Sequence, residues 1–196
     1  MYAGLCAWLY IKQRDMLYFP RPEVHLDSAE TIWLETPGAR LKLWRLPGSG
    51  RNALVYFGGN AEPVHLNIDT FRAWFPEHNI YFVNYRGYGG STGTPNETDL
   101  CADARAIYDH LRAGYGQISV IGRSLGSGVA TCLASQRDIA KLALITPFDS
   151  IRAVASNLYP MFPVALLLED SFDSAAYASA IDAEVLIMLA TEDNII

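Results

Sequence analysis

The 196 residues, of which 51% are hydrophobic and 18% charged, describe one folded domain with a sizeable core and leave little room for a second domain. The net charge of −6, without any run of basic residues, gives no reason to expect nucleic acid as a partner. The cysteine count is odd and contains no CxxC pair, which predicts reduced thiols and argues against a disulfide framework or a zinc site. The cysteines are Cys6, Cys101 and Cys132.

The chain begins with an uncharged run, Tyr2–Ile11, that is followed at once by Lys12 and Arg14. This run is too short to span a bilayer, which takes roughly 20 apolar residues, and it lacks the flanks of a secretory signal. Two interpretations stay open: a terminal helix that packs on the domain or lies at a membrane interface, or the distal half of an anchor whose first half is missing. We therefore divide the chain into an apolar N-terminal segment, 1–15, and a single domain, 16–196.

From Thr31 onward, short apolar runs alternate with helical patterns, which predicts an α/β domain with a mostly parallel sheet and helices on both faces. Two runs, 31–35 and 40–46, flank Pro37-Gly38 and predict an antiparallel hairpin. Later runs are nearly continuous in apolar residues, as strands covered on both faces are. These runs are Ala53–Phe57, Ile80–Asn84, Ile118–Ile121, Leu142–Ile145 and Val185–Ala190.

Helical periodicity fills the intervals between these strands. Apolar residues predict a helix over 64–75 and a second over 97–112, whose start is marked by Asn96 as an N-cap. A third helix is expected over 125–135. The interval 147–184 contains more apolar residues than a simple connection requires, so we expect either a lid over an acyl-sized pocket or an ordinary buried helix there.

The most specific motif is Gly122-Arg123-Ser124-Leu125-Gly126, which fits G-x-S-x-G and lies between a predicted strand and a predicted helix. Such a turn is so tight that the residues two before and two after the serine must be small, which explains Gly122 and Gly126. The turn exposes Ser124 Oγ at a helix N-terminus, where developing negative charge is favoured. Ser124 is therefore the predicted nucleophile, and the N–H of Leu125 a predicted oxyanion donor.

Further motifs accompany this turn, and their chain order is informative. They are Tyr18-Phe19-Pro20, Tyr56-Phe57-Gly58-Gly59-Asn60-Ala61, Tyr85-Arg86-Gly87-Tyr88-Gly89-Gly90-Ser91 with Gly93-Thr94-Pro95, and Pro147-Phe148-Asp149-Ser150. Together they resemble the α/β-hydrolase superfamily, in particular its single-domain, often membrane-anchored serine hydrolases, which include lysophospholipase-like and depalmitoylating esterases. The resemblance covers nearly the whole chain from Met16 and implies an α/β-hydrolase fold and a serine hydrolase activity.

The glycine pair Gly58-Gly59 ends a predicted strand and frees backbone N–H groups to face a bound carbonyl oxygen. We take the N–H of Asn60 as the second oxyanion donor, beside that of Leu125. The family usually has His where this chain has Gly58, which alters the packing behind the loop but leaves the backbone donors in place. A simple glycine turn is the alternative interpretation.

The acid of a catalytic triad is expected on the turn after a late strand. Asp193, which follows the run Val185–Ala190, occupies that place and is similar to the family's acid turn. Asp149, one strand earlier, is the alternative, since some relatives carry the acid there. Otherwise Asp149 is an exposed loop carboxylate or the N-cap of a helix that begins near Ser150.

The catalytic histidine is missing from the sequence, because only Asn194, Ile195 and Ile196 follow Asp193. The histidines that are present all precede Ser124, on segments that this topology does not bring to the nucleophile. They are His25, His65, His78 and His110. The simplest account is a C-terminally incomplete chain, in which the last strand, the last helix and the histidine between them are absent. We expect such a chain to be inactive alone.

The expected function is hydrolysis of carboxylic esters or thioesters with an apolar acyl group, through an acyl-enzyme on Ser124. The alternative is a non-catalytic binding protein that keeps the pocket and has lost the base. No metal and no cofactor are expected, since the glycines from Gly87 lack the third glycine of a dinucleotide fingerprint at Thr92. The expected partner is a small-molecule or lipid ester, and the expected location is membrane-associated or cytoplasmic.

Overall fold

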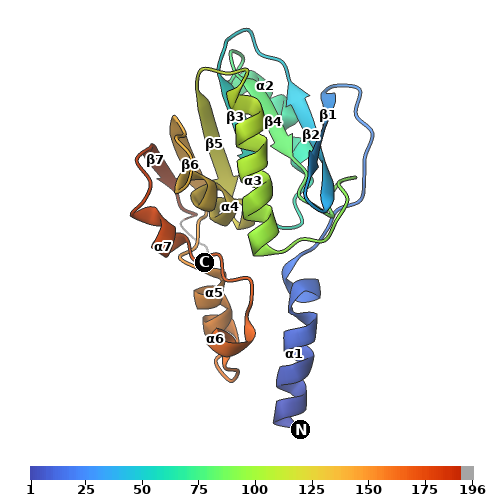
Figure 1. Cartoon of the computed structure of the whole chain (residues 1–196), viewed down its shortest axis with the longest axis vertical. Helices are drawn as coiled ribbons and strands as arrows, with labels where there is room; N and C mark the ends of the chain where they lie inside the picture. The colour runs from blue at the N-terminus through green and yellow to red at the C-terminus, as the bar shows by residue number, and fades with distance from the viewer. Residues whose placement is uncertain (191–196) are drawn as a thin grey trace.

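A computed structural model describes residues 1–190 of the chain, as a central sheet with helices on both faces (Figure 1). The strands are β1 (Glu30–Thr36), β2 (Ala39–Leu46), β3 (Ala53–Phe57), β4 (Asn79–Val83), β5 (Ile118–Arg123), β6 (Lys141–Ile145) and β7 (Glu184–Met188). Within the described residues they form a seven-stranded sheet in the order β1-β2-β4-β3-β5-β6-β7. The predicted runs differ from these strands by at most two residues at either end.

Strand directions follow the expected pattern. β1 and β2 form the predicted antiparallel hairpin around Pro37-Gly38, and β2 also pairs antiparallel with β4. From β4 to β7 all neighbouring strands are parallel. The expected α/β class with a mostly parallel sheet is therefore confirmed.

Helices and helical turns occupy the intervals. They are α1 (Tyr2–Leu17), η1 (Val64–Asn67), α2 (Ile68–Trp74), α3 (Glu97–Arg112), α4 (Leu125–Ala134), α5 (Ile151–Leu158), α6 (Val164–Leu167) and α7 (Ser174–Ala178). The predicted helix over 64–75 is divided into a 3₁₀ turn and a short α-helix. Asn96 caps α3 as predicted, because its side-chain oxygen accepts a hydrogen bond from the N–H of Asp99 at 2.9 Å.

The sheet separates two apolar cores, one on each of its faces. Every residue of β3 is buried, and its side chains alternate: Val55 and Phe57 join the core under α3 and α4, whereas Leu54 and Tyr56 join the core under η1 and α2. The prediction of two-sided burial is wrong for β7. In the described part of the chain β7 pairs only with β6, and all five of its residues are exposed because no helix covers them.

The N-terminal segment forms α1, which projects from the edge of the domain beside α5 and α6 (Figure 1). Tyr2 at its start donates a hydrogen bond to the carbonyl of Met161 at 2.7 Å, and Gln13 near its end accepts one from the N–H of Glu169 at 2.8 Å. The helix therefore docks along the segment that connects α5 to α7. Among residues 1–190, no helix has both the length and the hydropathy that crossing a bilayer demands.

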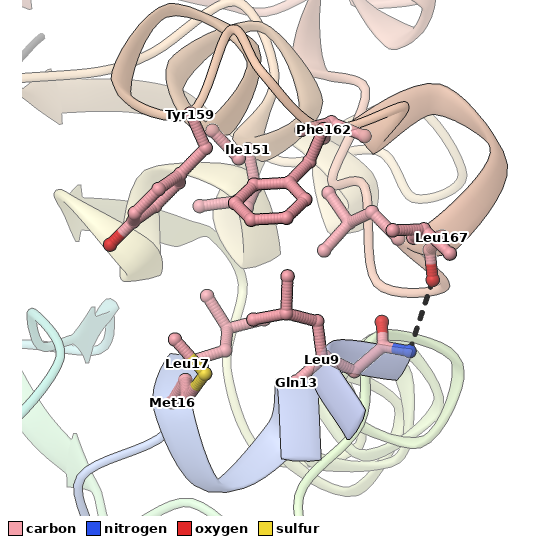
Figure 2. Close-up of a pocket in the computed structure, with 11 residues that line it drawn as sticks. Leu9, Gln13, Met16, Leu17, Ile151, Tyr159, Phe162 and Leu167 are labelled. Carbon is pink, nitrogen blue, oxygen red and sulfur yellow. Dashed lines mark hydrogen bonds between the residues drawn. The ribbon is translucent and has the colours of Figure 1, made fainter. Parts of the chain in front are cut away.

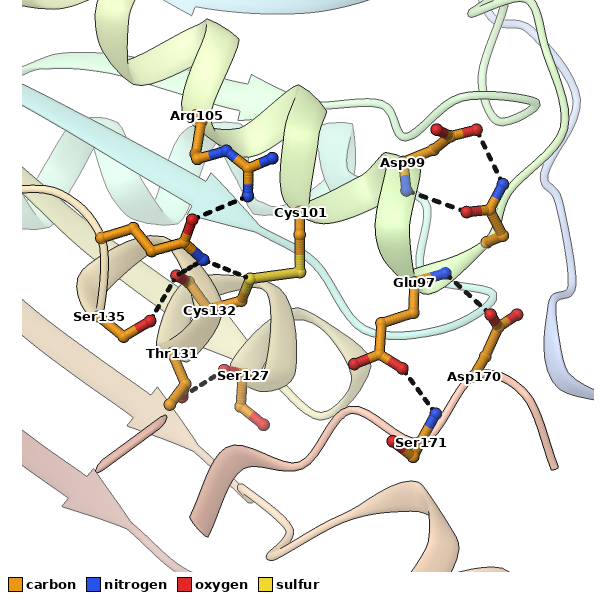
Figure 3. Close-up of a disulfide and its surroundings, with 12 residues drawn as sticks. Glu97, Asp99, Cys101, Arg105, Ser127, Thr131, Cys132, Ser135, Asp170 and Ser171 are labelled. Carbon is orange, nitrogen blue, oxygen red and sulfur yellow. Dashed lines mark hydrogen bonds between the residues drawn. A yellow bond between two sulfur atoms is a disulfide. The ribbon is translucent and has the colours of Figure 1, made fainter. Parts of the chain in front are cut away.

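The cysteines differ from the prediction of three reduced thiols. Cys101 on α3 and Cys132 on α4 form a disulfide, and Cys6 is free. Both bonded residues are buried where the two helices pack side by side on one face of the sheet (Figure 3). A separation of 31 residues hides this pairing from the sequence, because only the packing of α3 on α4 brings the two thiols together.

Candidate active site

Ser124 lies in the sharp turn between β5 and α4. Its backbone has φ 48° and ψ −117°, a conformation that non-glycine residues rarely adopt and that is typical of strained functional turns. A Cβ at Gly126 would overlap the carbonyl oxygen of Phe57, and one at Gly122 would lie 2.6 Å from Cβ of Ala130. Both positions therefore require glycine, for the steric reason that the motif indicated.

The surroundings of Ser124 leave its side chain available. The residue is half-buried, and its N–H donates to the carbonyl of Ile145 at the end of β6, at 2.9 Å. Its own carbonyl accepts from the N–H and the hydroxyl of Ser127, at 2.7 and 2.6 Å. Within residues 1–190, neither Ser124 Oγ nor the N–H of Leu125 has a hydrogen-bond partner. The predicted nucleophile and a helix-terminal N–H that has no acceptor in the described part of the chain thus belong to adjacent residues.

The loop after β3 faces this turn. A Cβ on Gly59 would lie 3.7 Å from Cβ of Ser124, which is ordinary van der Waals contact, so the loop and the turn are close neighbours. The Gly59 N–H is taken by the carboxylate of Glu62, at 2.5 Å. The N–H of the next residue, Asn60, has no acceptor among the described residues. Among the described residues, the backbone N–H groups of Asn60 and Leu125, the two predicted oxyanion donors, therefore both lack an acceptor.

Glu62 organises this loop and was not singled out by the sequence. One carboxylate oxygen accepts from the N–H of Gly59, and the other accepts from the hydroxyl of Tyr56 at 2.7 Å and from Nδ2 of Asn67 at 2.6 Å. Burial, and then the negative charge of Glu62, raise the pKa of Tyr56 above its ordinary value. The sequence pattern that could have pointed to Glu62 is weak, because a glutamate three residues after a glycine is common in loops.

The side chain of Asn60 ties the same loop to the N-terminal segment. Its Nδ2 donates to the carbonyl of Leu17 at 2.5 Å, and its Oδ1 accepts from the N–H of Phe19 at 3.0 Å and from the hydroxyl of Tyr88 at 2.9 Å. The three partners come from the end of α1 and from the loop after β4. The sequence indicated only the backbone N–H of Asn60, because these contacts join positions far apart in the chain.

The two candidate acids are placed differently. Asp193 lies outside the described residues. Asp149 follows β6, is exposed, and lies directly before Ser150, whose hydroxyl accepts from the N–H of Ala153 at 3.0 Å. Ser150 is therefore the N-cap of α5, which leaves Asp149 as a loop carboxylate in the described part of the fold.

None of the histidines is hydrogen bonded to Ser124. His25 is exposed beside Asp27, at 3.3 Å, and His110 is on the exposed side of α3. His65 is half-buried in η1, and His78 packs edge-on against Phe75. Among residues 1–190, no group of three or more His, Cys, Asp and Glu side chains is arranged to hold a metal ion.

A buried carboxylate, Asp170, joins three elements at the same edge of the sheet. It accepts from Nε of Arg14 at 3.1 Å, from the hydroxyl of Tyr18 at 3.0 Å and from the N–H of Glu97 at 3.1 Å. Glu97 in turn accepts from the N–H of Ser171 at 2.6 Å (Figure 3). These contacts fasten α1 and the segment before α7 to the start of α3.

An apolar groove of about 160 Å³ lies between α1 and the α5–α6 segment (Figure 2). Leu9, Gln13, Met16 and Leu17 line it from α1, and Ile151, Tyr159, Phe162 and Leu167 face them across it in the same figure. Ala155, Val164 and Leu168 complete the lining. The groove lies at the edge of the sheet where the parallel strands end, the edge at which β5 leads into Ser124 (Figure 1).

Comparison with known proteins places this geometry in a family. A family profile described as alpha/beta hydrolase fold matches residues 52–181. An uncharacterized protein of Mycobacterium tuberculosis is 33% identical and aligns with 99% of this chain and 74% of its own length. The alpha/beta hydrolase domain-containing protein 17C of Homo sapiens is 34% identical; the alignment covers 98% of this chain but only 59% of that protein.

Solved structures share the fold at lower identity. An esterase of Pyrococcus furiosus superposes with a TM-score of 0.69 at 18% identity, over 91% of this chain and 79% of that chain. Epoxide hydrolase A of Mycobacterium thermoresistibile superposes with a TM-score of 0.56 at 22% identity, over 68% of this chain and 44% of that chain.

Proposed function

The chain belongs to the alpha/beta hydrolase fold family, and on that premise we propose that it is a serine hydrolase of carboxylic esters or thioesters with an apolar acyl group. The observation that carries the proposal is the strained turn at Ser124, where neither the hydroxyl of Ser124 nor the N–H of Leu125 makes a hydrogen bond among the described residues. Strain of this kind persists only where the surrounding structure enforces it, and here Gly122 and Gly126 allow the turn to pack tightly against α4 and β3.

The proposed chemistry is acyl transfer in two steps. Ser124 Oγ attacks the acyl carbon, and its proton passes to a general base. The N–H groups of Asn60 and Leu125 stabilise the oxyanion that forms. The bond to the alcohol or thiol then breaks, the leaving group takes the proton, and water hydrolyses the acyl-enzyme. We propose Asp193 as the acid that orients the base, and we assign the base to none of the four histidines in the sequence.

Labelling with a fluorophosphonate probe tests the proposal on the 196-residue chain, with Ser124→Ala as the negative control. Ser119→Ala, a half-buried serine on the same strand, is the matched variant that should label like the parent. Added imidazole supplies a general base in solution. We expect labelling that requires Ser124 and that imidazole accelerates.

Absence of Ser124-dependent labelling, with and without imidazole, would contradict the proposal. It would favour a non-catalytic protein that uses the same fold to bind an apolar ligand. Strong labelling without imidazole would instead show that a base within the chain already activates Ser124.

A further inference from the structure

We propose that the groove between α1 and the α5–α6 segment binds a single alkyl chain. In the hydrolysis reaction the bound alkyl chain is the apolar part of a substrate whose carbonyl reaches Ser124. This role in the reaction rests on the proposed function, whereas binding of an alkyl chain does not. The N-terminal helix is thereby one wall of a ligand site, a role that its sequence does not suggest.

The lining offers a ligand almost nothing polar. Among residues 1–190, no charged side chain lines the groove, and Gln13 contributes the only side-chain amide. Gln13 Nε2 donates to the carbonyls of Tyr10 and Leu167, at 2.8 and 3.1 Å, and its Oε1 accepts from the N–H of Glu169 at 2.8 Å. Because the Gln13 amide is already hydrogen bonded, it offers little to a polar ligand, which would lose hydrogen bonds to water on entry.

The hollow is held open between two docked elements. At the start of α1, Tyr2 bonds to the carbonyl of Met161 and stacks on Phe162, with ring centres 6.0 Å apart. Near its end, Gln13 bridges to Leu167, as the dashed line in Figure 2 shows. These ties fix the spacing of the walls while the apolar side chains between them leave space.

The size of the groove favours a small apolar occupant. In another protein, an engineered apolar cavity of about 150 Å³ stays free of water and binds benzene. A groove of about 160 Å³ suits several methylene groups of one chain. A helix of a partner protein, about 10 Å wide with its side chains, needs far more space than this groove offers.

The groove leads toward the candidate nucleophile. Leu17 lines it, and the carbonyl of Leu17 accepts a hydrogen bond from the side chain of Asn60. Asn60 follows Gly59, which lies close to Ser124. An alkyl chain in the groove therefore has its inner end beside the oxyanion loop, where an ester or thioester carbonyl would have to lie.

Calorimetric titration with decanoate tests the binding site, because decanoate contains no bond to cleave. Ala155→Trp fills the groove from α5, and Ala153→Trp places the same side chain on the exposed side of the same helix. We expect decanoate to bind the parent and Ala153→Trp equally, and Ala155→Trp at least tenfold more weakly. Affinity should rise about fourfold for each methylene added from octanoate to decanoate.

The outcomes separate this inference from the proposed function. Failure of decanoate to bind, or equal binding by both tryptophan variants, would overturn the alkyl-chain site even if Ser124 labels. Groove-dependent binding without Ser124-dependent labelling would keep the site and remove the hydrolase. Binding of decanoate only to a self-associated form, seen by sedimentation velocity, would also overturn it, since the groove would then belong to a second copy.

Discussion

The side chain of Asn60 donates a hydrogen bond to the main-chain carbonyl of Leu17, at 2.5 Å, and so joins the loop beside Ser124 to the last turn of α1. The same amide accepts from the N–H of Phe19 and the hydroxyl of Tyr88. The hydrogen bonds that fix the orientation of this side chain thus all come from residues distant in sequence. The N-terminal helix and the proposed oxyanion donor are parts of one hydrogen-bonded unit.

Asn60→Ala should slow Ser124-dependent fluorophosphonate labelling by roughly ten- to hundredfold, because the backbone N–H of residue 60 would no longer be held in place. The loss of these hydrogen bonds should also lower the free energy of unfolding by about 1–3 kcal/mol. Asn52→Ala, at a half-buried asparagine outside the loop, is the control. An unchanged labelling rate in a folded Asn60→Ala protein would contradict the positioning role.

Gly126→Ala should destabilise the fold by about 1–3 kcal/mol or more, because the new methyl group overlaps the carbonyl oxygen of Phe57 on β3. Urea unfolding followed by circular dichroism measures the change. Gly116→Ala is the matched control, since nothing lies within 4 Å of a Cβ at that position. Equal stability of the two variants would contradict this packing, because it would mean that the turn at Ser124 can accommodate a methyl group beside Phe57.

The Cys101–Cys132 disulfide should be detectable by counting thiols. In denaturant without reductant we expect one reactive thiol, that of Cys6, and three after reduction. Closing a loop of 31 residues predicts that reduction lowers the free energy of unfolding by about 4 kcal/mol. Cys6→Ser should leave that difference unchanged. Three reactive thiols before reduction would restore the prediction from the sequence.

Tyr88 should make the protein sensitive to alkali. Burial raises the pKa of Tyr88 to about 12, from an ordinary value of 10.0, although the N–H of Phe19 acts in the opposite direction. Because the folded state favours the protonated phenol, its contribution to stability is complete below about pH 10 and is lost as the pH rises through about 12. Unfolding free energies from about pH 9 upward should therefore fall more steeply for the parent than for Tyr88→Phe. Parallel curves would show that Tyr88 titrates alike in both states.

The positions of the strands along the chain and the sharp turn at Ser124 could be predicted because both depend on local patterns. A strand such as Ala53–Phe57 is apolar throughout because both of its faces are covered, and a turn with glycine on each side of Ser124 is required by backbone sterics within five residues. Asn96 could be recognised as a cap for the same reason, since its acceptor and donor lie three positions apart.

The remaining features depend on contacts between distant positions, which no local pattern encodes. Cys101 and Cys132 meet only because α3 packs on α4, and an odd cysteine count pointed to the opposite conclusion. The apolar run at the N-terminus indicated burial or lipid, but only the tertiary structure turns Leu9 toward Phe162 and leaves a groove between them. Apolar periodicity shows which residues are buried. It does not show which apolar surfaces pack together, because that depends on where the sheet places the ends of its strands.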